Sequence, residues 1–200
     1  MAEPTVRSVC VFCGSRSGVR AEYREAASRM GAALAKRGLT LVYGGASVGL
    51  MGAVADAVIA NGGKTVGVLP HFMDAKELAH PRLTELHRVD SMHSRKAMMA
   101  ERSDAFVALP GGFGTLDELF EIVTWAQLGL HRKPMGLLDV DGFFQPLLAM
   151  AKQMVEAGFV PETQGVPFAV NASPDALLDR LLAGPTMPLT SKWLKDGQQT

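Results

Sequence analysis

Near the middle of this 200-residue sequence, an apolar segment ends in the run Leu109-Pro110-Gly111-Gly112-Phe113-Gly114-Thr115-Leu116-Asp117-Glu118. The segment itself, residues 105–109, is short and uninterrupted, which predicts a buried parallel strand. The three glycines that follow allow the backbone to turn tightly and to approach a ligand closely. A helix is predicted next, because its apolar positions are spaced as one buried face: Leu116, Leu119, Phe120 and Val123. Together these elements direct free N–H groups and the positive end of a helix dipole at an anion.

The same alternation of apolar strands and amphipathic helices extends over the rest of the chain. Strands are predicted at 7–13, 40–43, 65–69, 85–89, 105–109, 135–138 and 167–170, and helices at 20–37, 50–61, 91–102, 115–128, 143–157 and 174–182. This order implies right-handed βαβ crossovers. The expected fold class is α/β, a Rossmann-like open and mainly parallel sheet with helices on both faces. We expect residues 1–183 to form a single nucleotide-binding domain and residues 184–200 to form a C-terminal tail.

The composition excludes several classes of function. Lys and Arg together number 20, as do Asp and Glu, so the formal net charge is zero. Without a basic stripe, we expect no nucleic-acid partner. The first residues lack the apolar core of a signal peptide, and the weakly charged stretch 41–63 contains glycines and Asp56, which disfavour a membrane span. We therefore expect no membrane association and a cytoplasmic location.

The two cysteines, Cys10 and Cys13, have the C-x-x-C spacing. Redox pairs of this kind lie at the start of a helix, whereas here the pair lies inside a predicted strand. Three positions apart on a strand, the two side chains point to opposite faces of the sheet. Zinc would need further ligands, and His71, His87 and His93 lack the required spacing. We expect both cysteines to pack in the core, and we expect no metal.

Ligands of open α/β sheets bind beyond the carboxyl ends of the strands, so the loops after the first two predicted strands are candidates. Residues 13–18 include Ser15 and suit a phosphate or a ribose, although an ordinary tight turn has a similar composition. Residues 44–52 include Gly45 and are rich in glycine, which permits close approach of loop and sheet. Neither loop has the G-x-G-x-x-G spacing of dinucleotide enzymes or the Gly-Lys-Ser/Thr ending of a phosphate loop. NAD binding and ATPase activity are therefore disfavoured.

Two adjacent cations, Arg95 and Lys96, share a stripe of their predicted helix with Met92 and Met99. Cations on an apolar face need a partner for their charge, such as a phosphate or a carboxylate. Alternatively, the long side chain of Lys96 extends past the apolar surface to solvent.

Glu118 lies one turn into its predicted helix and has two compatible interpretations. The pattern Thr115-x-x-Glu118 before an apolar run is typical of a capping box, in which Glu118 would bond back to the backbone N–H of Thr115. A carboxylate beside an anion site is also a candidate catalytic group. The helix N-terminus is expected to favour the ionised form, which suits a base, a nucleophile or a stabiliser of positive charge.

The pairing of Met92-His93-x-Arg95-Lys96 with Pro110-Gly111-Gly112-x-Gly114-Thr115-x-x-Glu118 resembles the Lonely-guy family of cytokinin-activating enzymes. The resemblance extends from about Val9 to Val170 and includes Cys13-Gly14-Ser15 and Gly44-Gly45. Members of the family have been labelled lysine decarboxylases. No pyridoxal-phosphate lysine site is recognisable in this sequence.

The resemblance implies a phosphoribohydrolase, which cleaves the N-glycosidic bond of a nucleoside 5′-monophosphate with an adenine-type base and needs no cofactor. It implies a homodimer, and it implies that Arg95 and Glu118 are the catalytic pair. The residues implied to contact the substrate are Glu77, Lys96, Gly112, Phe113, Gly114, Thr115, Leu116 and Asp117. Gly111 and Ser15 join them as candidate phosphate contacts, with Gly45 from the second glycine-rich loop.

Two other functions stay open on the sequence alone. A nucleotide-binding carrier or sensor of the same fold would bind AMP without releasing adenine. A housekeeping hydrolase would act on AMP or another purine monophosphate rather than on a cytokinin precursor. Methionines within residues 92–99 are candidates for the apolar pocket that an N6-prenyl group would need.

Overall fold

The computed structural model describes residues 6–74 and 78–186, and its centre is a seven-stranded sheet in which all neighbouring strands are parallel. The spatial order is β4-β3-β2-β1-β5-β6-β7. The strands are β1 (Ser8–Phe12), β2 (Thr40–Tyr43), β3 (Thr65–Pro70), β4 (Glu85–Val89), β5 (Ala105–Ala108), β6 (Met135–Leu138) and β7 (Ala169–Asn171). The predicted fold class is confirmed.

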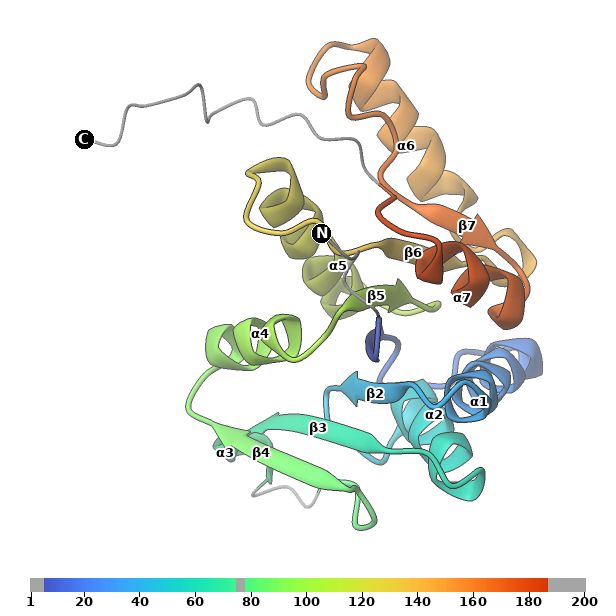
Figure 1. The fold of residues 1–200 in the computed structure, drawn as a ribbon, viewed down its shortest axis with the longest axis vertical. Helices are drawn as coiled ribbons and strands as arrows, with labels where there is room; N and C mark the ends of the chain where they lie inside the picture. The colour runs from blue at the N-terminus through green and yellow to red at the C-terminus, as the bar shows by residue number, and fades with distance from the viewer. Residues whose placement is uncertain (1–5, 75–77, 187–200) are drawn as a thin grey trace.

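Helices cover both faces of this sheet (Figure 1). They are α1 (Ala21–Lys36), α2 (Gly49–Ala60), α3 (His71–Asp74), α4 (Met92–Glu101), α5 (Phe113–Gln127), the 3-10 helix η1 (Val140–Gly142), α6 (Gln145–Glu156) and α7 (Pro174–Leu182). One hydrophobic core packs α1, α2 and α7 against the sheet, and a second packs α4, α5 and α6 against the opposite face. The central strands are therefore buried on both sides, which explains their largely apolar sequences, whereas the edge strand β4 carries Glu85, His87 and Arg88 and is mostly accessible.

The alternation of side chains along β1 separates the two cysteines as predicted. Cys13 belongs to the core beneath α1 and α2, with Val9 and Val11, whereas Cys10 and Phe12 belong to the core beneath α4 and α5. Both thiols are free and buried. The expectation of core packing is confirmed.

The predicted buried face of α5 was wrong at one position, Phe120, which is 40% exposed. The helix instead buries Thr115, Glu118, Leu119 and Ile122. The apolar spacing alone favoured Phe120, but the helix is rotated so that Glu118 reaches a buried cation on α4. Hydrophobic spacing alone does not predict that a charged side chain such as Glu118 occupies the buried face.

The strand order creates one position where ligands of this fold class bind. β1 pairs with β2 on one side and with β5 on the other, so the connections after β1 and β5 leave the sheet toward opposite faces. Such a topological switch point leaves a crevice beyond the carboxyl ends of the two strands. Residues 13–18 and 109–112, the two glycine-containing loops, meet there.

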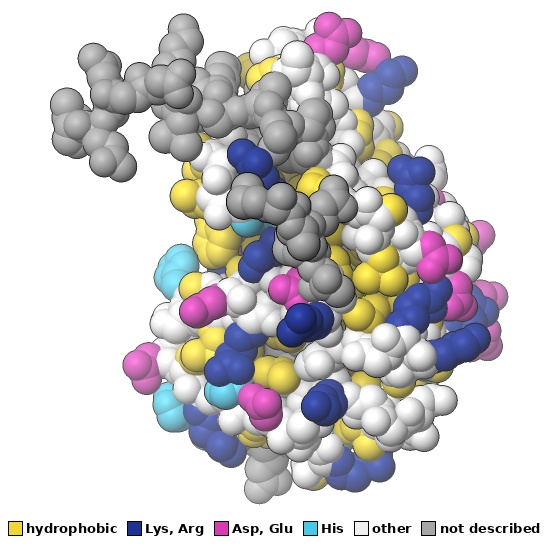
Figure 2. Space-filling view, in the orientation of Figure 1, with side chains coloured by type: hydrophobic (Ala, Val, Ile, Leu, Met, Phe, Trp, Pro, Cys, Tyr) yellow, Lys and Arg dark blue, Asp and Glu magenta, His cyan; other side chains and the backbone are white. Residues whose placement is uncertain are grey.

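Thr186, in the segment expected to be a tail, takes part in the fold. Its hydroxyl accepts from the Met135 backbone N–H at 3.1 Å and donates to the Pro167 carbonyl oxygen at 2.9 Å. The rest of the expected tail, residues 187–200, lies outside the described residues. Among the described residues, no helix has the length and apolar character needed to cross a membrane. On the face drawn in Figure 2, cationic and anionic side chains are interspersed.

Candidate active site

A cavity of about 650 Å³ opens at the switch point between β1 and β5. Its wall combines the loops after these strands with side chains from the flanking helices. It is lined by Cys13, Gly14, Ser15, Arg16, Ser17, Gly18, Tyr23, Leu50, Met51, Met73, Met92, Arg95, Pro110, Gly111, Gly112, Phe113, Gly114, Thr115, Glu118 and Phe143.

The two glycine loops are joined directly at the floor of this cavity. The Gly14 backbone N–H donates to the Pro110 carbonyl oxygen at 3.1 Å, and the Gly14 carbonyl oxygen accepts from the Leu50 N–H at 3.0 Å. A Cβ atom on Gly111 would lie 2.1 Å from the Thr115 hydroxyl oxygen and 2.9 Å from the Gly14 nitrogen. Because no side chain fits there, the turn after β5 requires glycine at this position.

Helix α5 begins two residues earlier than predicted, and this excludes the capping box. Its N-cap is Gly112, and no side chain bonds to the first turn as a cap. Thr115 lies inside the helix, with its side chain buried beneath Gly111. Gly112 and Gly114 have open space at their Cβ positions, so the first turn faces the cavity uncovered. Helix N–H groups without a side-chain cap are suited to bind an anion.

Arg95 and Glu118 form a buried ion pair in the same cavity. Helix α4 starts after Ser91, whose hydroxyl accepts from the Ser94 N–H at 3.0 Å, and Arg95 follows one residue later. The Arg95 Nη1 lies 3.2 Å from Glu118 Oε1, and Nε donates to the Val68 carbonyl oxygen at 3.1 Å. Arg95 is only 6% exposed and Glu118 only 9%. Two ions held this far from water need each other, because each would be costly to bury alone.

The environment of Glu118 differs from the expectation. Burial raises the pKa of the Glu118 carboxyl above its ordinary value, while the charge of Arg95 acts in the opposite direction. The expectation that the helix N-terminus would favour the ionised form was therefore wrong in its net direction, because desolvation is the larger effect.

Lys96 faces a different set of partners from Arg95. Its Nζ lies 3.0 Å from an Asp117 carboxylate oxygen and 3.3 Å from one of Glu121, and its side chain is largely buried. Burial disfavours its charge, yet the hydrogen bonds to Asp117 and Glu121 leave the pKa of Lys96 above its ordinary value. The alternative in which Lys96 extends freely to solvent is wrong. The lysine ties α4 to α5 next to the Arg95–Glu118 pair.

The structure brings most of the predicted site residues together, though not all. Ser15, Gly111 and the segment 112–115 line the cavity with Arg95 and Glu118. Lys96, Gly45, Leu116 and Asp117 are absent from its lining. Gly45 instead has a positive φ of 76° and packs near the backbone of β3. The predicted contact Glu77 lies outside the described residues.

Sequence reasoning missed several cavity residues that come from other helices. Tyr23 of α1 and Met73 of α3 line the cavity with Phe143, which precedes α6, and Met51 of α2 joins them from the candidate loop 44–52. No motif contains Tyr23, Met73 or Phe143, because the fold alone brings their segments to the cavity. Among the described residues, no group of three or more His, Cys, Asp or Glu side chains is placed to hold a metal ion.

Fold and site together define a Rossmann-like α/β protein whose cleft combines an uncapped, glycine-rich helix start with a buried carboxylate–guanidinium pair. Residues 51–181 match the family described as "Possible lysine decarboxylase". The probable cytokinin riboside 5′-monophosphate phosphoribohydrolase LOGL9 of Oryza sativa subsp. japonica is 53% identical over 170 residues, which cover 85% of this chain and 74% of that protein. The corresponding enzyme LOG3 of Arabidopsis thaliana is 48% identical over 163 residues, with coverages of 82% and 76%. The chain belongs to the Lonely-guy (LOG) family, as its paired motifs predicted.

More distant solved structures agree with the fold alone. The molybdenum cofactor binding protein from Rippkaea orientalis superposes with a TM-score of 0.67 at 20% identity, covering 92% of this chain and 98% of that one. At this identity the likeness concerns architecture and not the ligand.

Proposed function

We propose that this protein hydrolyses the N-glycosidic bond of cytokinin riboside 5′-monophosphates, and of AMP, to release the free base and ribose 5-phosphate. The observation that carries the proposal is the Arg95–Glu118 pair, 3.2 Å apart and buried in the same cavity as the glycine turn. The named activity of relatives that are about half identical supports the same reaction.

The 5′-phosphate would be held by the uncovered first turn of α5 and by Ser15 across the cavity. Backbone N–H groups and the helix dipole both favour an anion at this place. Binding energy from the phosphate is remote from the reacting bond and can therefore be used to orient the sugar.

Glu118 would act on the ribose. Cleavage of an N-glycosidic bond passes through a state with positive charge on the sugar, as in other glycoside hydrolyses. A carboxylate next to the sugar stabilises that charge or activates the attacking water, and Arg95 keeps the carboxylate oriented. The electron pair of the broken bond leaves with the base, and water supplies both the hydroxyl at the sugar carbon and the proton that the released base gains.

The base would extend toward the methionines that line the cavity near the ion pair. Met92 lies there as anticipated, but its companions are Met51 and Met73, while Met99 is buried in the core. Flexible thioether side chains adapt to an apolar substituent on the base. We expect a higher kcat/KM for isopentenyladenosine monophosphate than for AMP, and the reverse order would favour a housekeeping hydrolase.

The experiment that tests the function is product analysis with a panel of nucleoside 5′-monophosphates and the matching nucleosides. We expect free base and ribose 5-phosphate in equal amounts, with far slower reaction of nucleosides that lack the phosphate anchor. Tight AMP binding without base release would instead identify a carrier or sensor. Equal rates for nucleotides and nucleosides would contradict the role of the glycine turn.

We also propose that the protein is a homodimer. Phe113, Phe120 and Leu130 belong to α5 or follow it closely, and they are 94%, 40% and 69% exposed. Exposed apolar side chains gathered on one element are typical of a surface that another protein covers. Since Phe113 also lines the cavity, a partner on this surface would lie close to the site.

We propose a cytoplasmic location for the reaction. Both cysteines of the chain are free, which is typical of a reducing compartment. The nucleoside monophosphates that serve as substrates in this proposal are also intracellular metabolites. Fractionation of cells that express a tagged full-length chain tests the location.

A further inference from the structure

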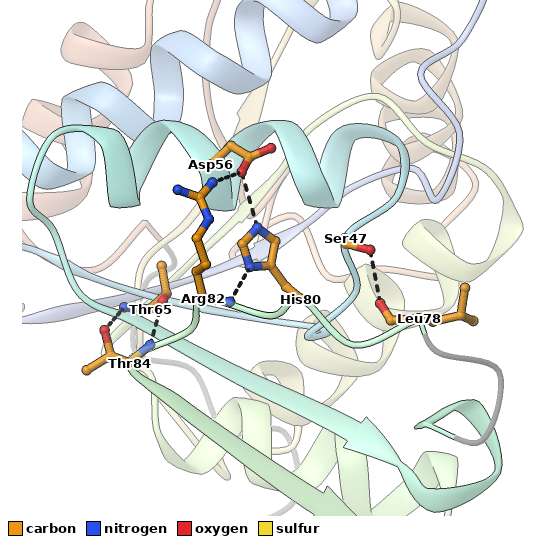
Figure 3. A network of polar contacts seen from close by, with 7 residues as sticks. All are labelled: Ser47, Asp56, Thr65, Leu78, His80, Arg82 and Thr84. Carbon is orange, nitrogen blue, oxygen red and sulfur yellow. Dashed lines mark hydrogen bonds and ion pairs between the residues drawn. The ribbon is translucent and has the colours of Figure 1, made fainter.

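A polar network between α2 and the segment before β4 lies next to the site but is not part of it (Figure 3). Its centre is His80, which is only 5% exposed. The His80 Nε2 lies 3.2 Å from an Asp56 carboxylate oxygen, and the Arg82 backbone N–H donates to Nδ1 at 3.2 Å. Because Nδ1 accepts a hydrogen bond, Nε2 carries the proton and donates it to Asp56.

The same segment is paired with the loop after β2 through its backbone. The His80 N–H donates to the Gly45 carbonyl oxygen at 2.9 Å, and the Ser47 N–H donates to the Leu78 carbonyl oxygen at 2.9 Å. An antiparallel bridge joins Ala46 to Ala79 between these two bonds. Residues 78–80 therefore lie between the 44–47 loop and helix α2. They bond to the loop through their backbone and to Asp56 of α2 through the His80 side chain.

That loop is in direct contact with the proposed catalytic pair. A Cβ atom on Gly44 would lie 1.8 Å from Arg95 Nη2, so the guanidinium lies against the Gly44 backbone. Arg95 is thus enclosed by Gly44, by the Val68 carbonyl oxygen and by Glu118. A shift of the 44–47 loop would change the position of the guanidinium, because no side chain separates the two.

We propose that His80 is a positioning residue for the hydrolysis reaction. Bonded to Asp56, it holds the 44–47 loop against Arg95 and so fixes the arginine relative to Glu118. The inference rests on the proposed function. A displacement of about 1 Å at a reacting group can reduce a rate by about 100-fold. The turn that would hold the phosphate, residues 111–115, makes no contact in this network, so substrate affinity should change little.

The test compares His80→Ala with His80→Gln, which can still donate to Asp56, and measures kcat and KM for AMP. We expect His80→Ala to lower kcat by about 10- to 100-fold with KM within about threefold of wild type, and we expect His80→Gln to recover part of kcat. Urea unfolding of each variant gives its folded fraction, so that kcat is expressed per folded molecule.

Two variants serve as matched controls. Thr84→Ala removes the hydrogen bond that the Thr84 hydroxyl accepts from the Thr65 N–H at 3.1 Å, at the far end of the network from the 44–47 loop. The bond from the Thr84 backbone N–H to the Thr65 hydroxyl, 3.0 Å long, remains. Arg82→Ala removes an exposed ion pair to Asp56 but keeps the backbone N–H that His80 accepts. Both should keep kcat within about threefold of wild type. An equal loss of kcat in Thr84→Ala and His80→Ala would overturn the inference, since it would indicate general destabilisation.

A crystal structure of His80→Ala provides a readout that does not depend on turnover. We expect the Arg95 guanidinium to move away from Val68 and Glu118. An unchanged guanidinium together with an unchanged kcat would overturn the role of His80 and leave the proposed function intact. Failure of the wild-type protein to release base would count against the function itself, and the position of Arg95 in the variant would still decide the inference.

Discussion

If Glu118 takes part in the reaction, turnover depends on its negative charge and not on the shape of its side chain. Glu118→Gln keeps the size of the side chain and a hydrogen-bond acceptor for Arg95 but removes the negative charge. We expect kcat to fall by about 100- to 1,000-fold, which is typical for loss of an electrostatic stabiliser. The unfolding free energy should change little or rise at neutral pH, because burial already disfavours the charged form of this side chain in the native state. Steady-state kinetics and urea unfolding measure the two effects.

Glu156→Gln is the control for this substitution. Glu156 is an exposed helix glutamate whose ion pair with Lys152 is open to solvent, so neither activity nor stability should change appreciably. If Glu118→Gln keeps kcat within about tenfold of the wild-type value, the carboxylate charge is not needed for the reaction and the proposed role of Glu118 is wrong.

The buried position of Glu118 also predicts the pH dependence of activity. Because burial raises its pKa, the carboxyl binds a proton at higher pH than an ordinary glutamate does. Activity that needs the carboxylate should therefore fall as the pH falls through this raised pKa. An exposed glutamate has a pKa of about 4.3. The acid limb of the kcat/KM profile should lie at a higher pH than this value.

The titration of Glu118 also makes the unfolding free energy depend on pH, in a direction that the raised pKa fixes. The native state binds it more tightly than the unfolded state, so the contribution of Glu118 to stability is greatest at low pH and is lost as the pH rises through the raised pKa. Thermal unfolding followed over the same pH range separates a titrating active site from acid unfolding. An acid limb at the position of an ordinary glutamate would contradict the assignment to Glu118.

At the scale of elements, periodic segments could be predicted and short irregular ones could not. Every predicted strand and helix is present with its ends within two residues, because each carries a run or a repeat long enough to define a buried face. Helix α3 and the 3-10 helix η1 have four and three residues, too few for any repeat, and both were missed.

The same contrast applies to the candidate site. The chemistry-bearing motifs predicted Arg95, Glu118 and the glycine turn, since each motif combines its residues within one short segment. His80 belongs to none of these motifs, and its partner Asp56 is 24 residues away on α2. The start of α5 was misplaced because Thr115-x-x-Glu118 has the spacing of a cap, although Thr115 is needed beneath Gly111. Only the folded chain reveals such long-range partners.

The first turn of α5 gives a prediction that separates ligand binding from folding. A Cβ atom on Gly114 would have no neighbour within 4 Å, and alanine is a better helix former than glycine. Gly114→Ala should therefore keep or slightly raise the thermal midpoint. If a phosphate approaches this turn, KM for AMP should rise by about tenfold or more while the slow hydrolysis of adenosine stays the same. Unchanged KM would place the phosphate elsewhere.

At the scale of the whole molecule, the exposed apolar side chains on α5 predict self-association. Analytical ultracentrifugation of the full-length chain should give about twice the mass of the 21.3 kDa chain. Phe120→Asp should shift the equilibrium to monomer, because a buried charge without a partner weakens an interface by several kcal/mol. If the second subunit completes the active site, Phe120→Asp should also lower kcat/KM.

Leu182→Asp is the matched control for the dimer. Leu182 is 43% exposed, close to the 40% of Phe120, but lies on α7, which packs on the opposite face of the sheet. In analytical ultracentrifugation, the Leu182→Asp variant should show the same mass distribution as the wild-type protein. A wild-type mass equal to one chain at micromolar concentration would exclude a stable homodimer.

The wall of the cavity also includes Cys13, a thiol held inside the protein with its neighbour Cys10 on the other side of the sheet. Burial raises the pKa of the Cys13 thiol far above its ordinary value, and the nearby carboxylate of Glu118 adds to the effect. The thiolate is the form that reacts with alkylating agents and peroxides. Iodoacetamide should therefore leave the native enzyme active, and an inhibitor that must react with a thiolate should not modify Cys13.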